Sequence, residues 1–430
     1  MLLKRFQLGL IHVAVAMTLV PINSTLNRVM IKELAISATV VAILASLPYL
    51  FAPIQMVIGA YSDRHPIFGF KRTPYIILGL ILCVTGVVVS PLVAYNLASG
   101  NAWGYLIAAL AFGAWGMGYN LSSVSYLSLA DDISGENERG KTISVMWFMM
   151  IIGIIFTAIA ISRMVDPYTP AALQRAFLIV GTTALVLGLL GLIRLEPATY
   201  QSSDAHNYTI REMSSAITSN PAAKLFFIYL WLLLAAILGQ DILLEPFGAQ
   251  AFGMSVRETT RITSIWGVFV LGAILLAGAL EGRVTRRRIA QTGNIGALLG
   301  FLVILASGWV GSLSIFYSGV ALLGAGTGLS TVGNLSLMFD LTVPEKVGLF
   351  IGAWGLSNAL SRLTGSVLGG IVRDVVTGAT GNPLSGYMVV FGIEAALLLI
   401  AILMLSRIDV ASFRTQAEAT SVFERAAMTD

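Results

Sequence analysis

The stretch that decides the fold reads GAYSDR at residues 59–64 and, after six further residues, KRTP at 71–74. It is a short, basic connection between two long apolar runs, at 38–61 and 73–94. A helix of about 20 apolar residues is long enough to cross the hydrocarbon core of a bilayer. A short basic loop between two such runs therefore predicts a helical hairpin that is inserted in a membrane.

The rest of the chain repeats this pattern. Of its 430 residues 57% are hydrophobic and only 11% are charged, whereas soluble domains carry about 25% charged residues. This composition predicts an all-α polytopic membrane protein in contact with lipid, and it argues against a soluble enzyme or a nucleic-acid-binding protein. Twelve apolar runs are recognised, at 10–30, 38–61, 73–94, 104–130, 142–164, 173–194, 222–245, 260–281, 289–309, 312–337, 348–372 and 385–406.

Lysine and arginine are distributed unevenly among the connections. If the N-terminus is cytoplasmic, 18 of them fall on the cytoplasmic side and 7 on the outer side. The positive-inside rule then predicts that both termini are cytoplasmic. The longest polar connection, 195–221, divides the chain into an N-terminal half (1–194) and a C-terminal half (222–408), which is followed by a tail at 409–430.

An internal repeat relates the two halves. When the chain is shifted by 208 residues, nine of the 17 positions in 116–132 are identical to their counterparts in 324–340. Asp166 likewise coincides with Asp374. The shift places spans four and five on spans ten and eleven. Because the copies are an even number of spans apart, the halves are predicted to be two parallel six-helix units.

The loop at 59–74 resembles the signature loop of the major facilitator superfamily. The matching residues are Gly59, Asp63, Arg64, Lys71 and Arg72. The resemblance implies a cytoplasmic gate in which Asp63 lies at the start of span eleven, with Arg139 as a candidate partner. A carboxylate is favourable at a helix N-terminus. The alternative is that these basic residues only anchor the helices on the cytoplasmic side.

Polar residues in span seven are the first candidates for a binding site. Gln240, Asp241 and Glu245 precede Pro246, and the two acids have the i, i+4 spacing that places them on one helix face. Polar groups at membrane depth are costly and are often functional. The cluster lies at the outer helix end or at a break, because a residue before proline disfavours helix. It is interpreted as a cation, proton or magnesium-ligand site, or else as a hydrated cap that faces Arg257 and Arg261.

Other polar groups extend the set of ligand-binding candidates. Span one ends in polar residues that line a cavity or are solvated, and it also contains a histidine that is a ligand or a packing residue. Span eleven carries an amide and an arginine near mid-membrane, and Glu394 of span twelve is the suggested partner of that arginine. These further candidates are His12, Asn23, Asn27, Arg28, Asn358 and Arg362.

Three stretches resemble the PucC-like, or bacteriochlorophyll-delivery, branch of the major facilitator superfamily. They are residues 25–34, residues 61–65 with 71–76, and residues 240–248. The resemblance implies a factor that binds or delivers chlorophyll or bacteriochlorophyll. Its partners would be nascent light-harvesting or photosystem apoproteins and chlorophyll-synthesis enzymes. It implies a bacterial inner or photosynthetic membrane, intracytoplasmic or thylakoid, and a magnesium axial ligand among Gln240, Asp241 and Glu245.

Alternative functions remain open at this point. A proton-coupled secondary transporter of a small organic solute would use the carboxylates of spans seven and twelve, and a structural subunit of a photosynthetic complex would need no ligand. The chain contains one cysteine and three histidines, too few for a protein-ligated metal site built from those residues. No nucleotide-binding or acyl-transfer motif is recognised, so an enzyme is not expected.

Overall fold

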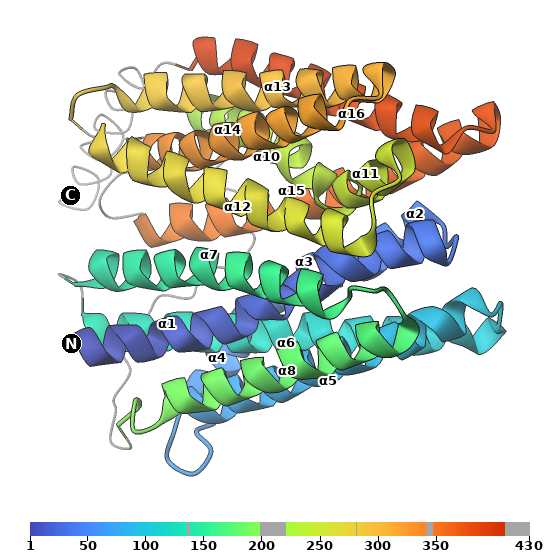
Figure 1. The fold of residues 1–430 in the computed structure, drawn as a ribbon. Helices are drawn as coiled ribbons and strands as arrows, with labels where there is room; N and C mark the ends of the chain where they lie inside the picture. Colours follow the sequence, from blue (N-terminus) through green and yellow to red (C-terminus); the bar gives the residue numbers. More distant parts are fainter. Residues whose placement is uncertain (136–137, 198–220, 281, 341–346, 409–430) are drawn as a thin grey trace.

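The computed structural model describes residues 1–135, 138–197, 221–280, 282–340 and 347–408. All regular elements in these residues are helices (Figure 1). The all-α class predicted from composition is therefore confirmed. The proposed linker at 195–221 and the tail at 409–430 lie largely outside the described residues.

The N-terminal helices form one layer of the molecule in Figure 1. The first predicted span is a continuous rod in which an α-helix passes into two π-helical segments. The second is divided into three short helices. The elements are α1 (Leu2–Met17), η1 (Pro21–Leu26), η2 (Val29–Glu33), α2 (Ala38–Ala45), α3 (Leu47–Leu50), α4 (Ile54–Arg64), α5 (Thr73–Ala98), α6 (Ala102–Ser134), α7 (Arg139–Met164) and α8 (Pro170–Leu192).

The C-terminal helices form the second layer (Figure 1). They are α10 (Pro221–Gly239), η3 (Gln240–Ile242), α11 (Leu244–Phe252), α12 (Val256–Ala279), α13 (Arg286–Val310), α14 (Leu313–Asp340), α15 (Val347–Thr380) and α16 (Pro383–Ser406). The beginning of α1 and the end of α16 lie at the same end of the molecule. We call that end the terminal face and the opposite end, where α2 begins and α15 ends, the distal face.

Nine helices in the described part of the chain are long and apolar enough to cross a membrane. The predicted number of twelve spans stays a prediction. The second predicted span is interrupted by Pro48 and Pro53, so none of its three pieces is long enough alone. Helices α6 and α15 are 33 and 34 residues long, but neither is among the nine.

Small residues that recur in the internal repeat allow close helix packing. A Cβ atom on Gly118 of α6 would lie 2.5 Å from the backbone nitrogen of Cys83 in α5. The repeat-related Gly326 of α14 is equally constrained, since its Cβ would lie 2.2 Å from the nitrogen of Ala297 in α13. Both helix pairs therefore touch backbone to backbone, which only glycine permits.

A buried polar network stabilises the C-terminal layer. Tyr229 of α10 donates a hydrogen bond to Oδ1 of Asn334 (2.5 Å) and accepts one from Nδ2 of Asn294 (2.8 Å). Ser330 donates to Oδ1 of Asn294 (2.8 Å). The side chains of Tyr229 and Asn294 are fully buried. Each of these bonds joins two different helices among α10, α13 and α14, so the network holds the three together.

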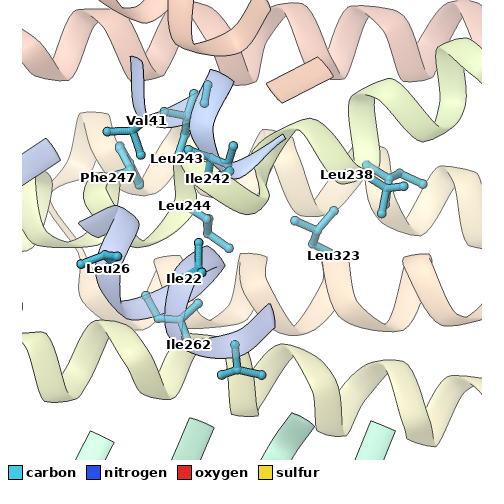
Figure 2. Packing of buried hydrophobic residues seen from close by; sticks show 14 of the residues in the cluster. Ile22, Leu26, Val41, Leu238, Ile242, Leu243, Leu244, Phe247, Ile262 and Leu323 are labelled. Carbon is cyan, nitrogen blue, oxygen red and sulfur yellow. The ribbon is translucent and has the colours of Figure 1, made fainter. Parts of the chain in front are cut away.

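The two layers share an apolar core near the break in span seven. Figure 2 shows Ile22 and Leu26 of η1 beside Leu244 of α11 and Ile262 of α12. Val41 of α2 belongs to the same buried cluster. The core therefore joins helices from both ends of the sequence at the level of the span-seven polar residues.

Polar contacts between the layers are found at the distal face. Asp374 near the end of α15 accepts hydrogen bonds from Ser37 Oγ (2.6 Å), Ala38 N (3.2 Å), Thr39 N (2.8 Å) and Thr39 Oγ1 (2.7 Å). Its carboxylate thus caps the N-terminus of α2, where negative charge is favourable. The repeat-related Asp166 pairs with Arg257 at the start of α12 (2.5 Å), but both of those side chains are more exposed.

Candidate functional site

Span seven is broken at its polar cluster. Helix α10 ends at Gly239, a 3-10 turn follows at Gln240–Ile242, and α11 begins at Leu244. Pro246 stands in the first turn of α11, where its missing N–H leaves no helical hydrogen bond unmade. In an uninterrupted helix that N–H would have bonded the carbonyl of Ile242. The break, one of the two positions expected from the sequence, follows from this proline.

The break separates the two acids of the cluster. The sequence predicted Asp241 and Glu245 one above the other on a single helix face, and this prediction is wrong. Asp241 lies in the 3-10 turn and pairs with α15, while Glu245 lies in α11 and contacts η1 and α12. The i, i+4 relation holds only within a continuous helix.

Glu245 is buried where α11, η1 and α12 meet. Its Oε1 accepts hydrogen bonds from Ser24 Oγ of η1 and from Thr263 Oγ1 of α12, both at 2.6 Å. Its Oε2 has no hydrogen-bond partner among the described residues. The side chain is only 3% exposed. One carboxylate oxygen is therefore fixed by two hydroxyls, and the other is left as an unsatisfied buried acceptor.

Asp241 has both oxygens engaged. Oδ1 accepts from Nε2 of Gln240 (2.9 Å), and Oδ2 accepts from Nη1 of Arg362 (2.7 Å). The guanidinium of Arg362 also lies over the ring of Tyr49 in α3, 5.3 Å from its centroid. Gln240 is 2% exposed, and its Oε1 has no partner in the described part of the chain. The cluster thus presents a paired acid beside an unpaired amide oxygen.

The partner predicted for Arg362 was wrong. The sequence suggested Glu394 of α16, whereas the structure pairs Arg362 with Asp241. Glu394 is 4% exposed, and its Oε2 has no hydrogen-bond partner among the described residues. The sequence alone does not give the register of span eleven against spans seven and twelve, so it could not choose between Asp241 and Glu394.

The end of span one is buried against the C-terminal layer. Arg28 is 3% exposed, forms an ion pair with Glu33 and donates to the carbonyl of Met254 (3.1 Å). Asn27 donates to the carbonyl of Asn23 (3.0 Å). The structure does not support a solvated helix end at Asn27 and Arg28. The π-helical turns η1 and η2 occur here, and such turns are frequent at functional sites.

Two candidates lie apart from this group. The ring of His12 packs on Tyr126 and Trp147, with ring centroids 5.1 and 5.7 Å apart, and its Nδ1 has no hydrogen-bond partner in the described residues. Asn358 donates to the carbonyl of Trp354 one turn earlier in α15 (3.1 Å). Among the described residues, neither side chain forms a hydrogen bond or ion pair with the span-seven cluster. Sequence reasoning in turn missed Thr263 and Tyr49, which no motif marks.

The basic loop forms an ionic cluster at the terminal face. Glu196, which the sequence did not single out, accepts hydrogen bonds from the backbone N–H groups of Lys71 (2.8 Å), Arg72 (3.0 Å) and Thr73 (2.7 Å). Arg72 is 3% exposed, donates to Ser62 Oγ (2.7 Å) and lies 3.5 Å from Asp132. The loop is thus fixed within the N-terminal layer at the start of α5.

The predicted gate contact is not tested. The side chain of Asp63 and residues 341–346, which precede α15, lie outside the described part of the structure. Gly59 and Arg64 are in α4, and a Cβ on Gly59 would only meet Val124 at 3.5 Å. Arg139 forms an ion pair with Asp131 (2.9 Å). The pairing of Asp63 with Arg139 stays a prediction.

Comparisons with known proteins identify both fold and family. The chain is 32% identical over 419 residues to "Protein PucC" of Cereibacter sphaeroides, covering 94% of this chain and 91% of that protein. It is 28% identical to the "Bacteriochlorophyll synthase 44.5 kDa chain" of Rhodobacter capsulatus, covering 94% of each. The crystal structure of the nucleoside transporter NupG has a TM-score of 0.73 at 14% identity, covering 94% and 98% of the two chains, and it shows a shared transporter fold of the major facilitator type.

The family assignment rests on most of the chain. Residues 25–413 match the family model described as PUCC protein. The matched region contains every ligand-binding candidate except His12 and Asn23. The part of the chain that the structure describes has nine helices suited to crossing a membrane, as expected of an integral membrane protein. The chain belongs to the PUCC family of membrane proteins.

Proposed function

We propose that this protein binds chlorophyll or bacteriochlorophyll and delivers it, as a non-catalytic assembly factor, to light-harvesting or photosystem apoproteins. Membership of the PUCC family supports the proposal, together with a relative whose name refers to bacteriochlorophyll synthesis. The assembly role and the pigment follow from the family resemblance of residues 25–34, 61–76 and 240–248. The pigment is sufficiently apolar to be exchanged within the membrane.

The observation that carries the proposal is a pair of unsatisfied buried oxygens in span seven. Chlorophyll and bacteriochlorophyll carry a magnesium ion, which an oxygen atom of the protein would hold, because oxygen is a preferred ligand of magnesium. Gln240 Oε1 and Glu245 Oε2 are buried acceptors without partners among the described residues. Asp241 is a poor candidate because Gln240 and Arg362 already occupy both of its oxygens. The donor set present is compatible with a magnesium-containing pigment, and these contacts favour Gln240 and Glu245 over Asp241 as the proposed ligand.

The remaining features of the proposal concern its setting. We place the protein in a bacterial inner or photosynthetic membrane with twelve spans and both termini in the cytoplasm, in line with the excess of basic residues on that side. Its partners would be nascent pigment-binding apoproteins and the enzymes that complete chlorophyll synthesis. Such partners would receive the pigment without its passing through water.

The test is the absorbance spectrum of the protein purified gently from a pigment-replete phototroph. We expect a chlorin band that survives in Gln174→Ala and is lost in the double variant Gln240→Ala/Glu245→Ala, which removes both candidate oxygens. Gln174 is a matched control, because its amide also has a buried oxygen without a hydrogen-bond partner in the described part of the chain, but it lies in α8 and donates to the carbonyl of Val88. The single variants show which oxygen is the ligand. A colourless wild-type protein, or a double variant that keeps its pigment, would refute the proposal.

A second candidate function is proton-coupled transport of a small organic solute. The observation that favours it is the Asp241–Arg362 pair, which joins the break in span seven to α15 in a chain that shares the fold of a nucleoside transporter. Ionisable pairs at membrane depth are frequent in proton relays. Uptake into proteoliposomes that follows an imposed pH gradient, and that is lost in Asp241→Asn, would favour this function. Absence of gradient-driven uptake for pigment-free protein would count against it.

A further inference from the structure

Glu394 is a buried acid for which neither the family nor the pigment proposal provides a role. It lies near the middle of α16 and is 4% exposed. Phe391 and Leu398, one turn away on either side, are fully buried. Oε2 of Glu394 has no hydrogen-bond partner among the described residues. An isolated ionised carboxylate in such surroundings is so costly that the group takes up a proton instead.

The carboxyl group lies against the point where α10 and α15 touch. A Cβ atom on Gly239 would be 3.0 Å from Oε1 of Glu394 and 3.3 Å from the Cα of Gly365. A Cβ on Gly365 would be 2.4 Å from the carbonyl oxygen of Ala235. Glu394 therefore faces the last turn of α10, which is the negative end of that helix's dipole. This position further disfavours a negative charge on Glu394.

The charged groups around Glu394 are few. Helix α16 packs against α10, α11, α13 and α15, and α15 in turn contacts η3. The charges in the middle of these elements are Asp241, Glu245 and Arg362. The other charged residues are near the helix ends: Lys224, Arg286, Arg287, Arg288, Arg373 and Asp374. Among the described residues none forms an ion pair with Glu394, and Arg362 is held by Asp241.

We propose that Glu394 is a proton-binding site, and that Glu394 and Asp241 share one proton and the single guanidinium of Arg362. Two carboxylates, one guanidinium and one proton sum to zero charge, which is the cheapest arrangement inside a membrane. The proton is on Glu394 in this structure because Asp241 has the guanidinium and is 25% exposed. Arg362 lies one turn before Gly365, which borders the Gly239–Glu394 contact. When the guanidinium moves to Glu394, the proton passes to Asp241.

The first test is infrared spectroscopy of the purified wild-type protein, for which no pigment is needed. We expect a carbonyl stretch of a protonated carboxylic acid that decreases by one group per chain in the isosteric variant Glu394→Gln. Glu196→Gln is the matched control. Glu196 is equally buried, at 6% exposure, but its oxygens already accept hydrogen bonds from three backbone N–H groups, so Glu196→Gln should leave the acid signal unchanged. An acid signal unchanged in Glu394→Gln would overturn the proposal.

The second test addresses sharing. In Asp241→Asn the set loses one carboxylate, so Arg362 is expected to pair with Glu394 and the shared proton to leave for the solvent. The part of the acid signal that is lost in Glu394→Gln should then already be absent from Asp241→Asn, and adding Glu394→Gln should cause no further decrease. If Glu394→Gln still removes an acid signal in the Asp241→Asn background, the proton on Glu394 is independent of Arg362 and the shared site is refuted.

Discussion

The distal contact between Asp374 and the start of α2 offers the sharpest quantitative prediction. The substitution Asp374→Asn keeps the shape of the side chain but removes its charge. Oδ2 of Asp374 accepts three of the four hydrogen bonds from α2, and Oδ1 accepts the fourth together with one from Arg373 (2.9 Å). An asparagine that keeps its oxygen at the Oδ2 position would turn its amino group toward Ala38 N and Arg373, so the Ala38 bond would be lost.

The magnitude follows from the change in these bonds. A hydrogen bond to a charged group contributes about 1.5–3 kcal/mol and a neutral one about 1 kcal/mol, and the helix N-terminus adds roughly 0.3–2 kcal/mol for a negative charge. Weakening three bonds and losing the fourth is therefore expected to cost about 3 kcal/mol of the contact between the layers. The side chain is 22% exposed, so solvent screens it only in part. The ratio of closed to open distal faces should fall by a factor of about 150.

The assay is the labelling rate of a cysteine placed behind this contact. Val41 of α2 is 1% exposed, so Val41→Cys in a Cys83→Ala background reacts with a water-soluble maleimide only when the distal face opens. The rate should rise on the order of 100-fold in Asp374→Asn. Asp166→Asn is the control, because its ion pair with Arg257 is exposed and such pairs contribute about 1 kcal/mol or less. Equal rates in the two variants, or no increase in Asp374→Asn, would refute the reasoning.

Two further predictions concern stability. Gly118→Ala would place a Cβ 2.5 Å from the backbone of α5, so we expect overpacking to lower the free energy of unfolding by about 1–3 kcal/mol. The control is Gly113→Ala in the same helix, whose Cβ would meet no atom within 4 Å and which should leave stability unchanged. Thermal unfolding in detergent compares them, and equal melting temperatures would contradict the packing argument. Tyr229→Phe leaves buried groups of Asn334 and Asn294 without a partner and should cost about 2–4 kcal/mol. Tyr168→Phe removes only one half-buried hydrogen bond, to Tyr95, so it should lower the free energy of unfolding by less than Tyr229→Phe does. A larger loss of stability in Tyr168→Phe would contradict a stabilising network at Tyr229.

Composition and periodicity were sufficient for the helical membrane class, whereas Pro246 left open whether the polar cluster of span seven lies at the outer helix end or at a break. Pairings between spans were not predictable. Arg362 has two acids within the same depth range, and only the three-dimensional register places Asp241 rather than Glu394 beside it. The π-helical turns of span one carry no sequence signal beyond their polarity, so the burial of Arg28 was missed. The two acids of span seven were assigned to one face because the spacing rule assumes a continuous helix.

The break in span seven also has a mechanical consequence. A continuous helix behaves as a rod, so a displacement at one end reaches the other. Here Tyr229 connects α10 to α13 and α14 by hydrogen bonds. Glu245 connects α11 to α12 and η1 in the same way. The short 3-10 turn at Gln240–Ile242, between α10 and α11, is a potential hinge, here called the joint. The two ends of span seven can therefore shift by different amounts, and the residues of the joint experience the difference directly.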